Sequence, residues 1–391
     1  MITIIISISS IVLLFWSSWL LLNGVISRIN IKKSIIHNID SSVLIIVPAH
    51  NEEITISKTL KSLIERTHHI KAKIIVLADN CSDKTIEESK KYCVEIVERQ
   101  DKLNKGKGAA LNWYFKNNEN VIQEYEYISI IDADTVVNKN YFETAISDMK
   151  TKNLDVLQSY YTEKSNNKNY STTKHSLEIA HNVRQQGMFN LIGQCLLKGN
   201  GMLFKNTVLL DEGWDSRSIV EDLDYSYYLI TSGYKIGYSQ NSIVYGEISN
   251  NVVAKGIQQK RWEGGRWKVM LKWIPNLFNK FKEELKVSYL LLALDLSVPP
   301  IMMLFTFIII NTLVSGFVSN YLLITNMVSL LILIDFIFLT PRKKYSGGFD
   351  ATCIEKIKEL YKIKLKVFYS LITEGVPKTF ERTPRLNEKR G

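Results

Sequence analysis

The sequence has only four cysteines, and their positions exclude two common kinds of cysteine-based architecture. Cys81, Cys93, Cys195 and Cys353 lack the paired spacing of a zinc site and the density of a disulfide framework. This agrees with a reducing compartment such as the cytosol. The sequence also lacks a Walker motif and any recognisable nucleic-acid-binding motif, so no nucleic-acid partner is expected.

Hydrophobic residues make up 46% of the 391-residue chain, an ordinary share, but they are concentrated in a few stretches. Near-continuous apolar runs cover residues 2–26 and 287–340. Because about 20 apolar residues span a bilayer as a helix, we expect one transmembrane helix in the first run and two in the second. Pro299-Pro300 predicts a kink, or a break between a surface helix and the true span.

We expect the first run to be a retained anchor, because it has no basic start and no small-x-small cleavage site and is too long for a signal peptide. Arg28, Lys32 and Lys33 follow it and place the middle of the chain in the cytosol by the positive-inside rule. The tail over 341–391 has 13 Lys and Arg against 6 Asp and Glu, a net +7 of the chain's +10. A basic tail beside a membrane exit points to anionic headgroups, so a multi-pass cell-membrane protein is expected.

The middle of the chain alternates strand and helix patterns. Residues 42–47 read as a buried strand stopped by Pro48, and a helix is expected over 51–66. Further strands are expected over 73–78 and 94–97. This alternation predicts a doubly wound α/β sheet.

An apolar run over 127–131 ends in Asp132-Ala133-Asp134. Such a run is typical of a central strand, and ligands collect where parallel strands end. Two carboxylates there suit Mg²⁺, which takes one or two protein carboxylates together with substrate phosphates; the alternative is an ordinary turn containing Asp. Asp79, which ends an earlier strand, would lie beside Asp132 unless it only caps the next helix.

Two glycine-containing segments are candidates for close contact with a ligand. Residues 104–112 form a basic turn that runs into a helix, where backbone N–H groups and Lys107 suit a diphosphate. Residues 199–204 read as a loop entering a strand, where a sugar or acceptor would pack. The alternative for the first segment is a solvated loop, and the alternative for the second is a plain β-turn.

Two later segments carry acidic, basic and aromatic side chains that could contact a ligand. Glu221 and Asp222 open a helix, where acids are favoured by the dipole in any case. The functional alternative makes Asp222 a general base. Within residues 258–267, the Arg261 guanidinium could bind a phosphate through two hydrogen bonds, and Trp262 has a flat face on which a sugar ring could stack. The alternative is an interfacial amphipathic helix, which has similar residues.

Together these segments resemble the family 2 membrane glycosyltransferases, the group that contains cellulose, chitin, hyaluronan and poly-N-acetylglucosamine synthases. The ordered motifs, over roughly residues 42 to 275, are Val47-Pro48-Ala49-His50-Asn51-Glu52, Asp79, Lys107-Gly108-Ala109-Ala110-Leu111-Asn112, Asp132-Ala133-Asp134, Glu221-Asp222 and Gln258-Gln259-Lys260-Arg261-Trp262. In the tail, Phe380-Glu381-Arg382-Thr383-Pro384-Arg385 resembles an element that follows the membrane helices in many relatives.

The resemblance implies a GT-A type, Rossmann-like mixed sheet in the cytosol, with one N-terminal and about two C-terminal transmembrane helices. It also implies a role for each matched residue: nucleotide binding for Ala49, Glu52, Asp79 and Asp132; metal binding, Mg²⁺ or Mn²⁺, for Asp134 and Asp132; contact with the diphosphate and the leaving group for Lys107 and Arg261; general base for Asp222; and the acceptor site for Trp262 and Gln258.

The implied reaction is inverting transfer from a UDP-sugar to an acceptor hydroxyl with formation of a β-glycosidic bond, and we expect it to serve exopolysaccharide synthesis. Three helices are few for a polymer channel. A homo-oligomer or export partner, or non-processive glycosylation of a membrane lipid, therefore stays open. The third alternative is a catalytically silent nucleotide-sugar-binding subunit of a secretion complex, against which the intact Asp222 and Arg261 argue.

The expected organisation has six segments. They are a transmembrane anchor (1–27), a linker (28–41), a GT-A glycosyltransferase domain (42–275), an interfacial helix (276–286), two transmembrane helices (287–340) and a basic cytosolic tail (341–391).

Overall fold

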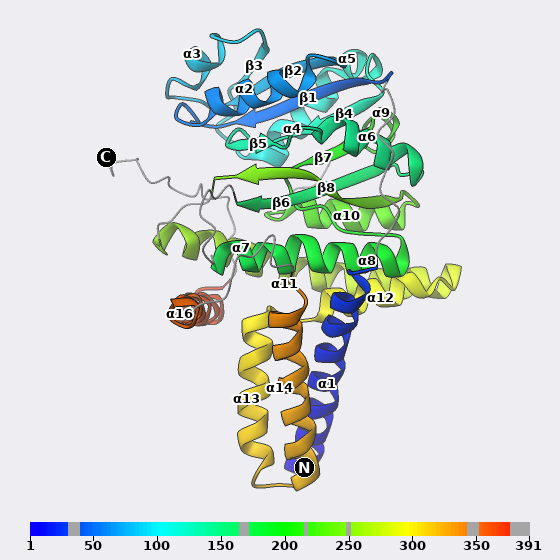
Figure 1. Cartoon of the computed structure of the whole chain (residues 1–391), viewed down its shortest axis with the longest axis vertical. Coiled ribbons are helices and arrows are strands. Elements are labelled where there is room, and N and C mark those ends of the chain that lie inside the picture. Colours follow the sequence, from blue (N-terminus) through cyan, green and yellow to red (C-terminus); the bar gives the residue numbers. More distant parts are fainter. Residues whose placement is uncertain (30–39, 164–171, 215–217, 248–251, 342–351, 376–391) are drawn as a thin grey trace.

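The computed structural model describes residues 1–29, 40–163, 172–214, 218–247, 252–341 and 352–375. An α/β domain stands above a layer of long helices, and three apolar helices extend together from the opposite side of that layer (Figure 1). The N-terminus lies at the far end of these apolar helices (Figure 1).

Within the described residues, eight strands form one mixed sheet in the order β3-β2-β1-β4-β7-β6-β8-β5. They are β1 (Ser42–Ala49), β2 (Lys71–Asp79), β3 (Glu95–Arg99), β4 (Tyr127–Ile130), β5 (Thr135–Val137), β6 (Val156–Glu163), β7 (Met202–Lys205) and β8 (Ile236–Gly246). The first four pair in parallel, whereas β7 runs antiparallel to β4 and β6. The mixed α/β sheet predicted from the sequence is confirmed.

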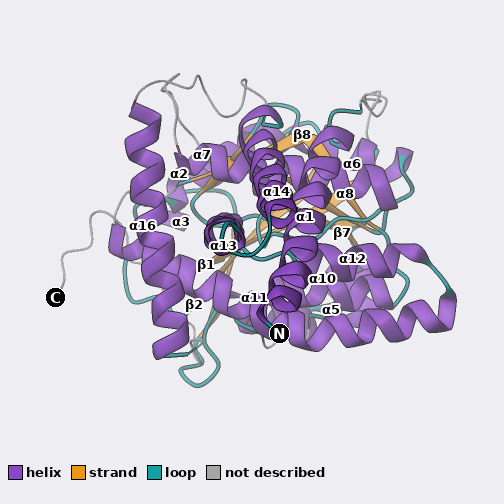
Figure 2. Cartoon of the chain, turned by 90° about the horizontal axis from the view of Figure 1, so that it is seen from below, coloured by secondary structure: helices purple, strands orange, loops and turns teal. Residues whose placement is uncertain are grey.

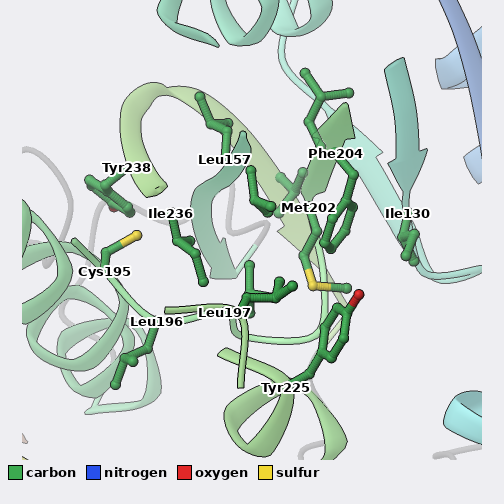
Figure 3. Packing of buried hydrophobic residues seen from close by; sticks show 14 of the residues in the cluster. Ile130, Leu157, Cys195, Leu196, Leu197, Met202, Phe204, Tyr225, Ile236 and Tyr238 are labelled. Atoms are coloured by element: carbon green, nitrogen blue, oxygen red, sulfur yellow. The ribbon is translucent and has the colours of Figure 1, made fainter. Parts of the chain in front are cut away.

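Helices cover this sheet and connect its strands. They are α2 (Ile56–Thr67), α3 (Thr85–Ser89), α4 (Lys107–Asn117), α5 (Glu119–Gln123), α6 (Tyr141–Thr151), α7 (Thr172–Leu177), the π-helix over Glu178–Val183, α8 (Arg184–Ile192), α9 (Asn206–Glu212) and α10 (Glu221–Thr231). In Figure 3, Tyr225 of α10 lies beside Met202 of β7 and Leu197, and all three belong to the buried core. The core thus anchors α10 to the antiparallel part of the sheet.

Two predicted boundaries near β1 were wrong. The strand does not stop at Pro48 but continues to Ala49, with Pro48 opposite Leu77 of β2. On its other side, β4 pairs with β1 only as far as Ile46, so the missing N–H of Pro48 falls beyond the β4 ladder. Helix α2 begins at Ile56 rather than at residue 51, because a turn closed by N–H groups bonding to the Glu52 carbonyl comes first.

The remaining helices form the lower part of the molecule. They are α1 (Ile2–Ile26), α11 (Val252–Glu284), α12 (Val287–Ser297), α13 (Ile301–Ser315), α14 (Asn320–Leu339) and α16 (Thr352–Thr373). By length and composition, α1 and α14 could each cross a bilayer, and the pair α12 and α13, bent by 74°, would be a third span if counted as one. The break predicted at Pro299-Pro300 is confirmed, and it divides residues 287–340 into three helices, of which α12 and α13 are the two parts of the bent pair.

One expectation for the C-terminal part was wrong, and another lies partly outside the described residues. A separate interfacial helix over 276–286 is not seen, because α11 passes through Pro275 and continues to Glu284. Its later part is held by packing along α12, with Leu277 fully buried. The tail over 341–391 contains α16, and its element at 380–385 lies outside the described residues.

Helix α1 is held between α8 and α14 by contacts at two glycines. A Cβ on Gly187 of α8 would lie 2.4 Å from the backbone carbonyl oxygen of Asn23 in α1. A Cβ on Gly24 would lie 2.3 Å from a side-chain carbon of Thr340, just after α14. The absence of a side chain at these positions lets the apolar helices pack directly beneath the α/β domain.

A buried ionic junction ties the same helices to the layer above. Arg184 of α8 donates to the Asp295 carboxylate of α12 at 2.7 Å, and Trp19 Nε1 of α1 donates to it at 3.2 Å. Arg266 of α11 donates to three carbonyls at the C-terminal end of α12, at 2.9 to 3.1 Å. Asp295 of α12 therefore joins α1 and α8 in the interior.

We expect Gly187→Ala to destabilise the protein, because a backbone atom blocks the new methyl group and no rotamer change relieves the clash. Overpacking of this kind costs about 1–3 kcal/mol, so the thermal unfolding temperature in detergent should fall. Gly256→Ala in α11 is the control, since its Cβ would have no neighbour within 4 Å. Equal unfolding temperatures for wild type and Gly187→Ala would contradict this packing.

Candidate active site

The two carboxylates after β4 share one side of the chain. Asp132 and Asp134 are partly exposed, whereas Ala133 between them is buried and its carbonyl accepts a hydrogen bond from Thr59 at 2.9 Å. The loop is therefore anchored to α2 through its middle residue. This anchoring leaves both carboxylates at the ends of the central strands.

Lys107 connects the acidic loop to a second segment. It is the first residue of α4 and follows Gly106, whose φ of 106° suits glycine. Its Nζ donates both to the Asp132 carboxylate and to the carbonyl of Gly199. The basic turn and the glycine loop, which the sequence showed as separate candidates, thus meet at Asp132.

The glycine loop is held in place by Asn200, which the sequence analysis did not identify. This side chain accepts from the Asp132 N–H at 3.2 Å and donates to Thr135 Oγ1 at 2.8 Å. Its flanking residues Gly199 and Gly201 have φ of 78° and 69°. The sequence signal for Asn200 was its place between two glycines. That signal could not show its hydrogen-bond partners, because Asp132 and Thr135 are remote in sequence.

Asp222 lies directly against this loop. A Cβ placed on Gly199 would be 3.2 Å from Asp222 Oδ2, a tight contact that the glycine avoids. Burial raises the pKa of Asp222, and the charges of Lys198 and Lys107 act in the opposite direction. The structure therefore brings Asp132, Lys107 and Asp222 together across Gly199.

Arg261 and Glu221 complete the charged centre. Burial and the neighbouring Asp222 raise the pKa of Glu221 to about 7, opposed by Lys107 and Arg261. Burial lowers the pKa of Arg261, opposed by the charges of Glu221, Asp222 and Asp132. Arg261 thus faces the acids of both the β4 loop and α10.

A close contact between α11 and the start of α10 sets this arrangement. A Cβ on Gly265 would lie 2.7 Å from a methyl carbon of Val220, the residue before Glu221. Further along, Asp224 accepts from Lys272 and Trp273, at 2.8 and 2.5 Å. The segment 258–262 is therefore carried on a helix that is fastened to α10 at several points.

The proposed acceptor residues occupy the same end of α11. Trp262 follows Arg261 and is 38% exposed, a large value for an aromatic side chain, and Gln258 lies one turn earlier and is partly buried. An exposed aromatic face beside a charged centre suits a sugar ring.

The residues expected to bind the nucleotide lie at the ends of β1 and β2. Ala49 is opposite Ala78, which places it next to Asp79. The Asp79 carboxylate is bound by Arg99 Nη1 at 2.6 Å, an ion pair that the sequence analysis missed. Glu52, in the turn after β1, accepts a hydrogen bond from Thr55.

Arg99 is opposite Asp79 in the β2–β3 ladder. Its other terminal nitrogen donates to Asp101 and to the carbonyl of Asn104, both at 2.8 Å. The Asp79 carboxylate is therefore part of a buried network that also orders the turn before α4.

Lys198 is a second cation that the sequence analysis missed. Its backbone N–H donates to Gln158 Oε1 at 2.8 Å, which fixes the start of the glycine loop to β6. Burial and the nearby Arg184 lower the pKa of its ammonium group to about 8, opposed by Asp222 and Asp295. Lys198 thus stands between Asp222 and the ionic junction at α12.

The acidic loop fits a divalent cation only together with another oxygen donor. Among the described residues, no group of three or more His, Cys, Asp and Glu side chains is arranged to hold a metal ion. Asp132 and Asp134 supply the one or two carboxylates that Mg²⁺ takes when phosphates complete its coordination. The residues are compatible with Mg²⁺ or Mn²⁺ held jointly with a diphosphate.

Comparison with family models gives two overlapping matches. One described as "Glycosyl transferase family group 2" covers residues 127–339, and one described as "Glycosyl transferase family 2" covers 44–206.

Curated relatives point in the same direction. The chain is similar to poly-beta-1,6-N-acetyl-D-glucosamine synthase of Staphylococcus epidermidis, with 27% identity over 246 residues, 60% of this chain and 57% of that protein. The synthase of the same name from Staphylococcus aureus strain COL is 26% identical over 271 residues, 65% of this chain and 61% of that protein. The matches thus span less than two thirds of these relatives.

Among solved structures, the fold is similar to the mannosyltransferase PcManGT from Pyrobaculum calidifontis, solved in complex with GDP-Man and Mn²⁺. The TM-score is 0.60 at 12% identity, covering 96% of this chain and 99% of that one. This likeness supports the GT-A-like fold predicted from the sequence.

We expect Glu221→Gln to stabilise the protein at neutral and alkaline pH. The folded state holds the Glu221 proton more tightly than the unfolded chain, since its pKa rises from the ordinary 4.5 to about 7. Ionisation therefore opposes folding, and the gain from Gln should be full above pH 7 and vanish below about pH 4.5. Thermal unfolding across pH checks this, with the exposed Glu87→Gln as control; a gain independent of pH would contradict it.

Proposed function

The chain belongs to glycosyl transferase family group 2, and from this premise we propose that it is an inverting, metal-dependent enzyme that transfers a sugar from a UDP-sugar to an acceptor hydroxyl. The product would carry a β-glycosidic bond and serve exopolysaccharide synthesis at the membrane. Similarity to the poly-beta-1,6-N-acetyl-D-glucosamine synthases supports the polysaccharide role.

The observation that carries this proposal is the position of Lys107 between two parts of the site. Its ammonium group contacts Asp132, on the donor side, and the carbonyl of Gly199, which lies against the Asp222 carboxylate. A single displacement needs a base close to the reacting carbon and positive charge close to the leaving group. These residues supply both within one cluster.

In the proposed mechanism, Asp222 takes the proton from the acceptor hydroxyl as the new bond forms. Burial moves its pKa upward, toward the range in which a carboxylate is a more effective base. The charges of Lys198 and Lys107 oppose this rise. Attack on the face opposite the departing nucleotide inverts the anomeric centre.

The departing diphosphate requires positive charge, which Arg261 and Lys107 would provide. Arg261 has a planar guanidinium group suited to phosphate oxygens, and the negative charges of Glu221, Asp222 and Asp132 favour its charged form. Mg²⁺ or Mn²⁺, held by Asp134 and Asp132, would neutralise charge on the leaving group when bound. In the donor complex, Lys107 would exchange its contact with Asp132 for the diphosphate.

The other predicted residues would orient the two substrates. Ala49, Glu52 and Asp79 would line the nucleotide, with Arg99 holding Asp79 in place. Gln258 and Trp262 would contact the acceptor, which stacks on the exposed indole face.

We further propose that α1, α13 and α14 cross the cell membrane and that the α/β domain faces the cytosol. The apolar character of these helices is compatible with this location. A polymer path would then require a homo-oligomer or an export partner. Glycosylation of a membrane lipid is the second candidate, because the layer of α11 and α12 lies directly between the site and the apolar helices (Figure 1). A catalytically silent subunit is less consistent with the charged centre around Asp222.

We expect Asp222→Asn to reduce transfer by about 10² to 10⁴, because Asn has the same shape but cannot accept the proton. UDP affinity should stay nearly unchanged, since Asp222 contacts the acceptor. Initial rates with labelled donor and calorimetric titration with UDP measure the two effects. Asp211→Asn, exposed on α9, is the control. Equal transfer rates for Asp222→Asn and wild type would remove Asp222 from this role.

We expect purified membranes to incorporate label from one UDP-sugar into material that elutes as a polymer on a sizing column. A chelator should abolish incorporation, and Mg²⁺ or Mn²⁺ should restore it. GDP-mannose belongs in the same panel, because PcManGT was solved with that donor. Label in a single-sugar product that extracts into organic solvent would instead establish lipid glycosylation, and label from GDP-mannose alone would exclude UDP.

A further inference from the structure

Helix α16 packs against the helix that carries the segment 258–262. Lys364 on its inner face contacts both Gln259 and Glu263 of α11. Glu263 is only 6% exposed, so its charge depends on this partner. A second ion pair joins Lys260 of α11 to Glu374, just after α16.

These contacts surround the functional residues of α11 without including them. The three α11 residues bound from α16 and its end lie at positions 259, 260 and 263, on either side of Arg261 and Trp262. Because the contacts are made to neighbouring turns of one helix, a shift of α16 would alter the rotation and tilt of that end of α11. The reactive cluster would be displaced with it.

The outer face of α16 has a different character. Leu365, Tyr369 and Ile372 follow helical spacing and are exposed by 40%, 69% and 66%. Lys362 and Lys366 are exposed beside this apolar stripe. Apolar side chains bordered by lysines suit the boundary between acyl chains and anionic headgroups.

The surface is continuous with the apolar helices below. Tyr361 and Phe368 of α16 contact Thr306 and Phe307 of α13, through hydroxyl groups 3.0 Å apart and rings 6.5 Å apart. In Figure 1, α16 lies level with the upper end of α13, and Figure 2 shows it to one side of α1, α13 and α14. The apolar surface of α13 therefore extends onto the helix that touches α11.

We propose that the outer face of α16 rests on an anionic lipid surface and that Lys364 on its inner face transmits this contact to the segment 258–262. The consequence for transfer rests on the proposed function. Lys364 is a positioning residue, since it acts through Gln259 and Glu263. Sugar transfer would then be faster when the enzyme sits in an anionic membrane.

The experiment uses the full chain in nanodiscs of phosphatidylcholine alone and of phosphatidylcholine with one third phosphatidylglycerol. Hydrogen exchange over residues 358–373 should be slower in the anionic discs. The double variant Lys362→Gln/Lys366→Gln should lose this difference. Equal exchange in both discs for the wild type would overturn the lipid contact, whatever reaction the enzyme catalyses.

The coupling of α16 to the segment 258–262 is tested by Lys364→Gln. We expect its kcat to fall by about tenfold or more, with the KM for donor within about twofold, because the reacting groups are misplaced while the donor still binds. Lys364→Arg should restore most of the rate. In phosphatidylcholine alone, Lys362→Gln/Lys366→Gln should have the kcat of the wild type. Adding phosphatidylglycerol should raise the kcat of the wild type severalfold and leave that of the double variant unchanged.

Two results would overturn the proposed coupling of α16 to the segment 258–262. One is a wild-type kcat for Lys364→Gln, and the other is unchanged exchange over residues 256–264 in that variant. If the wild type transfers no sugar in any disc, the proposed function fails, and the two exchange measurements still decide whether α16 contacts lipid and whether it holds α11.

Discussion

The site depends on cations placed between carboxylates that would otherwise repel one another. Asp132, Glu221 and Asp222 come from two segments remote in sequence, and their convergence is costly in a partly buried place. Lys107 bonds to the acidic loop directly, and Arg261 carries charge opposite to all three acids. The same cations that make the cluster stable suit a diphosphate, so the fold and the proposed chemistry require the same residues.

Glycine decides how closely these charges approach. At Gly199 the loop leaves room for the Asp222 carboxylate, and at Gly265 helix α11 reaches Val220. At Gly187 the α/β domain meets the backbone of α1. Each contact joins one part of the molecule to the next, from the glycine loop to α10, from α10 to α11, and from α8 to α1.

The sequence predicted those parts of the structure that depend on neighbouring residues. The central strands and the place of Asp132 and Asp134 at their ends followed from an apolar run closed by acids. The roles of Arg99 and Asn200 did not, because each is defined by partners brought near only by the folded sheet. The prediction that β1 stops at Pro48 was wrong for a related reason. The effect of a proline on a strand depends on which neighbouring strand pairs with it at that position.

Helix α11 is continuous over 33 residues, which at 1.5 Å per residue makes a rod about 50 Å long. Arg261 and Trp262 are on its first turns, whereas its later turns pack along α12 in the layer above the apolar helices. A displacement of its later turns would therefore be carried to Arg261 and Trp262, because no break separates the two ends of the helix.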